Sequence, residues 1–222
     1  MAVIHHTRLV PTKLELLASW LPSRPWYGDG STGEPELANA GGFRLDDPQG
    51  EVGIEFIVVT DARGALPAAY LVPLTYRGAP LDGAGHALVG TMEHGVLGRR
   101  WVYDGCHDPV LIGQLPALIE GRAQAQDQNT TGTPARGITC AYTGDGPLPT
   151  DFATAATDTR ENTELPTLNG MVLRLHRVLR PTPEASSLAP RGTAGHIAGS
   201  WRMPDGSRAA GLFATLHTGL RS

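Results

Sequence analysis

A few side chains in this sequence belong to types that carry chemistry, and their spacing is the first test of each. Cys106 and His107 are adjacent, but adjacency in sequence does not make a nucleophile and base, and no Gly-x-Ser-x-Gly motif is present. The eight histidines are scattered, and the only neighbouring pair is His5-His6, so no cluster has the spacing of metal ligands. The sequence therefore predicts no catalytic residue and no metal site, and Cys106 is interpreted as a small buried residue.

One stretch with strand-like alternation carries several basic side chains. Arg174, His176 and Arg180 are separated by even numbers of residues, which predicts that they share one face of a strand over residues 171–179. Guanidinium groups pair well with phosphate, so this face could hold an anion. A solvated strand face explains the same spacing, and the alternation alone does not decide between them.

Three aromatic residues near the N-terminus form a second candidate binding group. Trp20, Trp26 and Tyr27 could stack on sugar rings, but the prolines between them equally favour rings that fix a loop to the core. The glycine-rich segment 28–33 that follows lacks the Lys-Ser/Thr ending of a phosphate-binding P-loop and is predicted to be an ordinary loop.

The elements that must position these residues begin with a helix. Thr12 is the expected N-cap, Glu15 completes a capping box, and apolar residues at helical spacing continue to Leu21. The period then changes to two, which predicts antiparallel strands joined in a meander. The expected strands are Phe43–Leu45, Val52–Thr60, Ala68–Tyr76, Ala87–Glu93 and Arg99–Tyr103.

A second helix is expected after the meander, with Asp108 as N-cap and Pro109 in the first position. Pro116 lies inside its apolar stripe and predicts a kink or a break. The polar segment 124–136 that follows is the best candidate for a domain boundary. We therefore expect a domain over residues 1–125 and a second region over residues 126–222.

The second region is predicted to be rich in β-structure. Strands are expected over residues 138–142 and 171–179, followed by a linker over 181–190 and a hairpin over 196–216 that turns at a Pro-Asp-Gly sequence. An isolated hairpin is marginally stable in water, so this one should pack on the 171–179 strand and form a small second sheet.

Composition narrows the class of protein. The 222 residues carry 18 basic and 22 acidic side chains, and a net charge of −4 gives no attraction to nucleic acid or to an anionic membrane. The 28 glycines and 18 prolines favour short strands and many turns. Two cysteines make no disulfide framework, and the N-terminus lacks a long apolar block, so a cytoplasmic protein is expected.

Four motifs in order resemble a known family. Trp20-Leu21-Pro22-Ser23-Arg24-Pro25-Trp26-Tyr27 resembles the start of the N-terminal cap domain of actinobacterial maltokinases and related aminosugar kinases. The later segments that resemble this domain are Tyr70–Arg77, Ala87–Gly90 and Val102–Pro109. The resemblance implies a cystatin-like cap, in which a helix packs on an antiparallel sheet. The expected fold class is therefore α+β, with this cap followed by a smaller β-rich region.

A second resemblance lies further along the chain. Residues 161–163 and 170–179 resemble part of the kinase small lobe, and Arg174 stands where those kinases have the lysine that binds nucleotide phosphates. The 43 residues after Leu179 are predicted to form a linker and a hairpin, so the kinase's catalytic and metal-binding aspartates are expected to be absent. Without them phosphoryl transfer has no general base and no metal site.

These observations favour a non-catalytic accessory or binding protein that resembles a freestanding maltokinase cap. The resemblance links it to α-glucan, trehalose or aminosugar metabolism, with a sugar kinase, an α-glucan enzyme or a maltooligosaccharide as partner and no cofactor of its own. Two alternatives stay open. One is a split or degenerate sugar kinase that binds nucleotide through Arg174; the other is a carbohydrate-binding module that uses Trp20, Trp26 and Tyr27.

Overall fold

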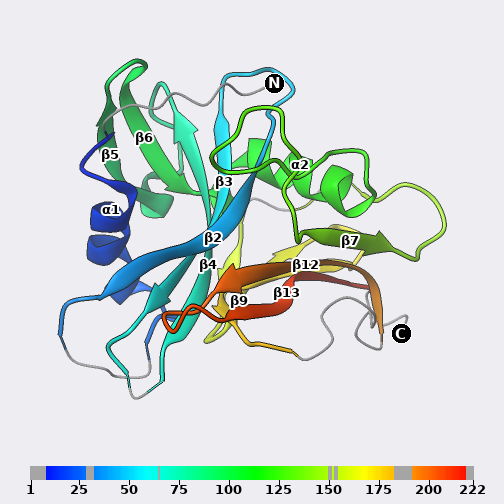
Figure 1. Ribbon diagram of the computed structural model, residues 1–222. Coiled ribbons are helices and arrows are strands. Elements are labelled where there is room, and N and C mark those ends of the chain that lie inside the picture. Colours follow the sequence, from blue (N-terminus) through cyan, green and yellow to red (C-terminus); the bar gives the residue numbers. More distant parts are fainter. Residues whose placement is uncertain are drawn as a thin grey trace.

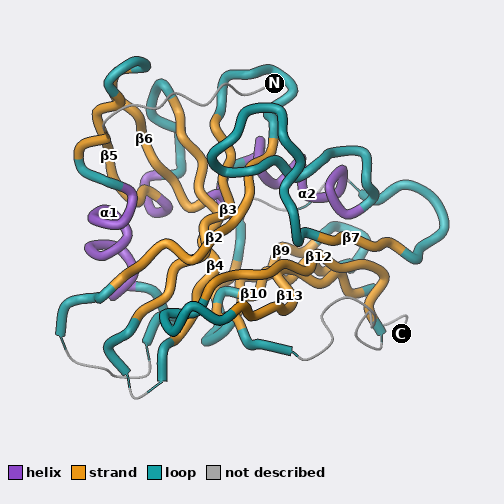
Figure 2. Tube along the Cα trace, in the orientation of Figure 1, coloured by secondary structure: helices purple, strands orange, loops and turns teal. Residues whose placement is uncertain are grey.

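Two antiparallel sheets form most of the molecule (Figures 1 and 2). The computed structural model describes residues 9–28, 33–64, 66–149, 152, 155–182 and 192–218. The first sheet contains β1 (Leu9–Val10), β2 (Leu37–Leu45), β3 (Gly53–Asp61), β4 (Ala68–Arg77), β5 (Leu88–His94), β6 (Gly98–Asp104) and β11 (Val178–Leu179). The second contains β7 (Thr139–Tyr142), β8 (Thr157–Asp158), β9 (Asn162–Pro166), β10 (Val172–His176), β12 (Thr193–Arg202) and β13 (Arg208–His217). The mixed α+β class with β dominance is confirmed.

The first sheet departs from the expected meander at one step. Its strand order is β1-β5-β6-β4-β3-β2, so β6 rather than β5 lies beside β4. The connection from β4 to β5 crosses this position and packs Leu81, Ala84 and Ala87 against Tyr103 of β6, whose hydroxyl accepts a hydrogen bond from the Leu81 N–H at 2.9 Å. Because this connection is buried against β6, β5 lies on the side of β6 that faces away from β4. The alternation of residues within single strands does not predict this order.

The first helix, α1 (Lys13–Trp20), begins as the sequence predicts. The Thr12 hydroxyl accepts from the Glu15 N–H, and the Glu15 carboxylate accepts from the Thr12 N–H at 2.7 Å, which completes the capping box. Lys13, the only lysine in the sequence, ties the helix to the sheet through an ion pair of 2.6 Å with the buried Glu55 of β3.

The second helix, α2 (Pro109–Ile119), follows the 3-10 turn η3 (Gly105–His107) and has the predicted cap. The Asp108 side chain accepts from the Val110 N–H at 2.9 Å, and Pro109 occupies the first turn. The predicted break at Pro116 is wrong, because α2 continues through that residue to Ile119. Among the residues that the structure describes, neither helix has the length and apolar character needed to cross a membrane.

Both faces of the first sheet are buried, each in a separate core. On one face, Ile57, Tyr70 and Val72 pack with residues of α1 and of the loop after it. On the other face, Phe43 and Phe56 pack with α2 and the second sheet. An aromatic stack crosses between the sheets, since the Phe43 ring lies 4.5 Å from that of Phe56 and 6.4 Å from that of Phe213, between ring centroids. The residues that alternate in β3 and β4 therefore serve two different cores.

A glycine pair lets β2 pass close to β3. Gly41 and Gly42 have φ of 131° and 133°, and the register between β2 and β3 shifts at this point. A Cβ on Gly42 would lie 2.0 Å from the Phe56 carbonyl oxygen. The bulge therefore requires glycine at position 42.

The second sheet confirms the predicted packing of the hairpin. β12 and β13 form the hairpin, β13 pairs with β10, and the order continues through β9 to β8 on one side and β7 on the other. The sheet is larger than expected because β8 and β9 were not predicted. Of the linker over residues 181–190, positions 183–190 lie outside the described residues.

The strand predicted over residues 171–179 is in fact two strands in different sheets. β10 ends at His176 in the second sheet, whereas β11 joins the first sheet beside the start of β4, where Val178 pairs with Tyr70. Arg174 and His176 are therefore separated from Arg180 by the residue at which the chain changes sheets, and the predicted continuous face of all three is wrong. That residue is Arg177.

Candidate functional site

Arg177 lies completely buried where the two sheets join. Its guanidinium pairs with the Asp104 carboxylate at 2.6 Å and its Nε donates to the Thr163 hydroxyl at 2.6 Å. The same group lies 4.9 Å above the centre of the Trp26 ring, within the range of a cation–π contact. Arg177 thereby connects the end of β6, the start of β9 and the loop after α1.

Backbone hydrogen bonds fix the chain on both sides of this residue. The Arg177 carbonyl accepts from the Leu71 N–H of β4 at 2.9 Å, and the Glu161 carbonyl accepts from the N–H groups of Arg177 and Val178 at 2.8 and 3.1 Å. The turn that carries Arg160 and Glu161 is therefore held beside β11 and the first residues of β4.

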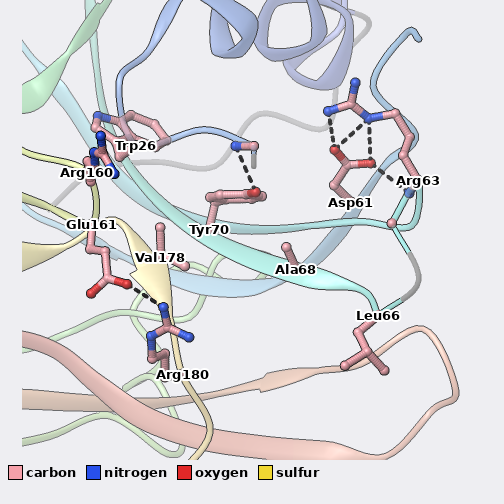
Figure 3. Close-up of a pocket in the computed structure, with 12 residues that line it drawn as sticks. Trp26, Asp61, Arg63, Leu66, Ala68, Tyr70, Arg160, Glu161, Val178 and Arg180 are labelled. Carbon is pink, nitrogen blue, oxygen red and sulfur yellow. Dashed lines mark hydrogen bonds and ion pairs between the residues drawn. The ribbon is translucent and has the colours of Figure 1, made fainter. Parts of the chain in front are cut away.

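A pocket opens at this junction (Figure 3). Its volume is about 430 Å³, within the range of small-molecule sites. One part of its wall belongs to the first sheet and the loop after α1, and the other to the 160–161 turn and β11. The lining residues are Trp26, Gly28, Asp61, Arg63, Gly64, Leu66, Ala68, Tyr70, Arg160, Glu161, Val178 and Arg180.

The wall at the end of β3 is a closed polar cluster. Asp61 accepts hydrogen bonds from the Tyr27 hydroxyl at 2.6 Å and from Arg63 Nε at 2.9 Å, and also from the backbone N–H groups of Glu36 and Arg63. Burial opposes ionisation of Asp61, but these donors hold its pKa below the ordinary value. Burial and the hydrogen bond to Asp61 raise the pKa of Tyr27, so its hydroxyl remains a donor.

The opposite wall carries charges that are less fully paired. Arg180 is 70% exposed in its side chain and forms an ion pair with the half-exposed Glu161. Arg160 is exposed and has no hydrogen-bond or ion-pair partner within the described part of the chain. Together with the closed Asp61–Arg63 pair, these residues give the lining one more guanidinium than carboxylate.

The structure buries the three aromatic residues proposed to bind sugar. Trp20, Trp26 and Tyr27 are 7%, 1% and 8% exposed, and the two tryptophan rings meet edge to face at 5.8 Å. Tyr27 packs on the Tyr70 ring at 4.9 Å. These contacts favour the alternative in which the rings fix the loop to the core, because stacking on a sugar requires an exposed ring face.

Arg174 lies on β10, away from the residues that line the pocket. Its guanidinium donates from Nε and Nη2 to the Glu164 carboxylate at 3.0 and 2.8 Å, and the two residues face each other in the pairing of β10 with β9. The neighbouring carboxylate already satisfies part of the guanidinium. Nucleotide binding by Arg174 stays a prediction.

The remaining candidates fall in two classes. Cys106 is buried, as expected, and burial raises the pKa of its thiol well above the ordinary value, which makes it a poor nucleophile. His5, His6 and most of the glycine-rich segment 28–33 lie outside the described residues. Within the ranges that are described, no three His, Cys, Asp or Glu side chains gather as a metal site would require.

Comparison with known proteins gives a match for the part of the chain that supplies most of the residues lining the pocket. Residues 20–108 match the family model of the maltokinase N-terminal cap domain. This segment is similar to the maltokinase cap domain. The match covers less than half of the chain, and it contains the four motifs on which the resemblance rested, except for Pro109 at the end of the last one. No curated protein matches the chain.

The cap domain thus supplies Trp26, Asp61, Arg63 and Tyr70 to the pocket, while Arg160 and Arg180 come from the region after it. The sequence analysis missed the role of Arg177, although a signal was present. Met171, Leu173, Leu175 and Leu179 are apolar residues at alternate positions, and Arg177 has the same parity. A charged residue at a buried position indicates a buried ion pair.

Proposed function

We propose that this chain is a non-catalytic accessory protein in which a maltokinase-type cap acts by binding a protein partner. The partner that fits the family is a sugar kinase or an α-glucan enzyme, in the cytoplasm of an actinobacterium that uses α-glucan, trehalose or aminosugars. The observation that carries the proposal is the match of residues 20–108 to the maltokinase cap.

The burial of the cap sheet supports contact through its ends rather than its faces. One face is covered by α1 and the other by α2 and the second sheet. At the end of the sheet formed by β1 and the β5–β6 turn, Val10, Val96 and Leu97 are 51%, 61% and 46% exposed. Exposed apolar side chains that gather in this way are typical of protein contacts, so we expect the partner to contact this end.

The proposal is tested by calorimetric titration of the full chain with a purified sugar kinase, with Mg-ATP and with maltoheptaose. We expect heat with the kinase and none with the two small ligands. The variant Leu97→Asp should abolish the heat with the kinase. The matched control Leu168→Asp changes a leucine that is 93% exposed in the turn between β9 and β10, and it should bind the kinase as the parent does.

Two other outcomes would contradict the proposal. Heat with Mg-ATP that disappears in Arg174→Ala would favour the degenerate sugar kinase. Heat with maltoheptaose but not with the kinase would favour the carbohydrate-binding module.

A further inference from the structure

The pocket at the junction is lined by three arginines and only two carboxylates, so its lining has an excess positive charge. The Asp61 carboxylate accepts hydrogen bonds from Tyr27, Arg63 and two backbone N–H groups. The ion pair of Asp61 and Arg63 therefore needs no ligand to complete it. Arg160 and Arg180 remain in the lining, together with one further carboxylate, that of Glu161, which pairs with Arg180. Arg160 has no partner among the residues that the structure describes.

The geometry of the turn keeps these two arginines at one wall of the pocket. Arg160 precedes Glu161, whose carbonyl holds the N–H groups of Arg177 and Val178, and Arg180 lies two residues after Val178. Arg180 donates one of its five N–H bonds to Glu161, which leaves donors for a second acceptor. The two guanidinium groups and the Glu161 carboxylate leave this wall with a net positive charge, which suits an anion, and the planar donor fork of a guanidinium matches the oxygens of a phosphate.

The rest of the pocket suits an uncharged ring. Val178 lies opposite Tyr70 in the pairing of β11 with β4, Ala68 lies two residues before Tyr70 on β4, and Trp26 lines the pocket with them (Figure 3). The volume of about 430 Å³ leaves room for one ring in addition to a phosphate.

We propose that this pocket binds a phosphomonoester attached to a ring, with Arg160 and Arg180 on the phosphate and the ring against the half-buried Ala68 and Val178. A sugar phosphate and a nucleoside monophosphate share this chemistry. The ligand contacts both the cap domain and the region after it, so its binding stabilises their junction. This site is independent of the protein contact proposed above, since it lies at the end of β4 opposite to the β5–β6 turn.

The test is calorimetric titration of the full chain with glucose 1-phosphate, AMP, inorganic phosphate and glucose. We expect glucose 1-phosphate or AMP to bind at least tenfold more tightly than inorganic phosphate and glucose, and the tighter of the two identifies the source of the phosphate. Arg160→Ala and Arg180→Ala should each weaken that binding about tenfold or more. Arg160 is exposed and has no partner among the described residues, so its variant should fold as the parent does.

Arg99→Ala is the matched control. Arg99 is 60% exposed and pairs with an exposed glutamate, as Arg180 does, but it lies on β6 at the opposite end of the sheet. Its variant should keep the full affinity. The proposal is overturned if neither phosphomonoester binds more tightly than inorganic phosphate. It is also overturned if binding survives Arg160→Ala, or if it is lost in Arg174→Ala but not in Arg160→Ala.

Discussion

At the scale of single residues, the buried pair of Arg177 and Asp104 is the contact whose mutation should lower stability most. Removal of one partner leaves the other charged and without compensation in the interior, which typically costs about 3–5 kcal/mol. We expect Arg177→Met to lower the free energy of unfolding in urea by about that amount. Arg99→Ala breaks an exposed pair and should cost less than about 1 kcal/mol. Equal losses in the two variants would show that the pair is not buried in solution.

Trp26 is the second residue whose burial can be tested. It is 1% exposed and contacts Trp20, Tyr70 and Arg177. Trp26→Ala should therefore reduce the free energy of unfolding by about 3–5 kcal/mol, as deletion of a buried aromatic ring does. Leu168→Ala, at a fully solvated position, should leave it within about 0.5 kcal/mol of the parent value. An unchanged melting temperature in Trp26→Ala would instead favour an exposed ring that stacks on sugars.

His176 gives the protein a predictable response to acid. Burial, and then the nearby charges of Arg174 and His217, lower its pKa to about 4, while the charge of Glu161 acts in the opposite direction. The unfolded chain keeps a histidine pKa near 6.5, so between about pH 6.5 and 4 the unfolded state binds more protons and stability falls as pH falls.

The variant His176→Gln removes this titration and keeps a polar side chain within reach of Thr215, which the imidazole contacts at 3.2 Å. We expect the stability lost between pH 7 and pH 4.5 to be smaller in the variant, by on the order of 2 kcal/mol. The measurement is urea denaturation at both pH values. The same loss in parent and variant would mean that His176 titrates normally.

At the scale of elements, the glycine bulge in β2 tests how closely β2 approaches β3. A side chain at position 42 would meet the Phe56 carbonyl, in a backbone conformation that suits glycine alone. Gly42→Ala should cost at least about 1–3 kcal/mol of stability by thermal denaturation. Gly113→Ala, in the open interior of α2, should be neutral or slightly stabilising. A neutral Gly42→Ala would contradict the close approach of β2 to β3.

Elements whose signals are local were predictable from the sequence. Thr12 and Glu15 define the start of α1, Asp108 and Pro109 define the start of α2, and the Pro-Asp-Gly turn defines the last hairpin. What the sequence did not reveal depends on contacts between distant segments. The order β5-β6-β4 results from burial of the Leu81–Ala87 connection on Tyr103.

The candidate site was predictable only in part, for the same reason. Trp26, Tyr27 and Arg180 were singled out by type, but their roles depend on partners far away in sequence. Arg180 reaches the pocket because the chain changes sheets at Arg177, which pairs with a carboxylate 73 positions earlier. Asp61 and Arg63 lie in a segment that predicts only a turn, and no local pattern indicates that they form a pocket wall.

At the scale of the whole molecule, the cap domain and the region after it meet through a shared sheet, a shared core and a shared pocket (Figure 1). β11 extends the cap sheet, and Phe213 of the second sheet stacks on Phe43 of the cap. The expected boundary near residue 125 stays a prediction. These contacts support a protein that offers its loops and strand ends to partners, which is how we propose the cap to function.

We propose that this chain works by binding and not by phosphoryl transfer. The direct measurement is the amount of sugar phosphate formed when the purified full chain is incubated with ATP, Mg²⁺ and either maltose or glucosamine. We expect no product above that of a blank without protein. Turnover that survives repurification, persists in Arg99→Ala and disappears in Arg174→Ala would contradict it.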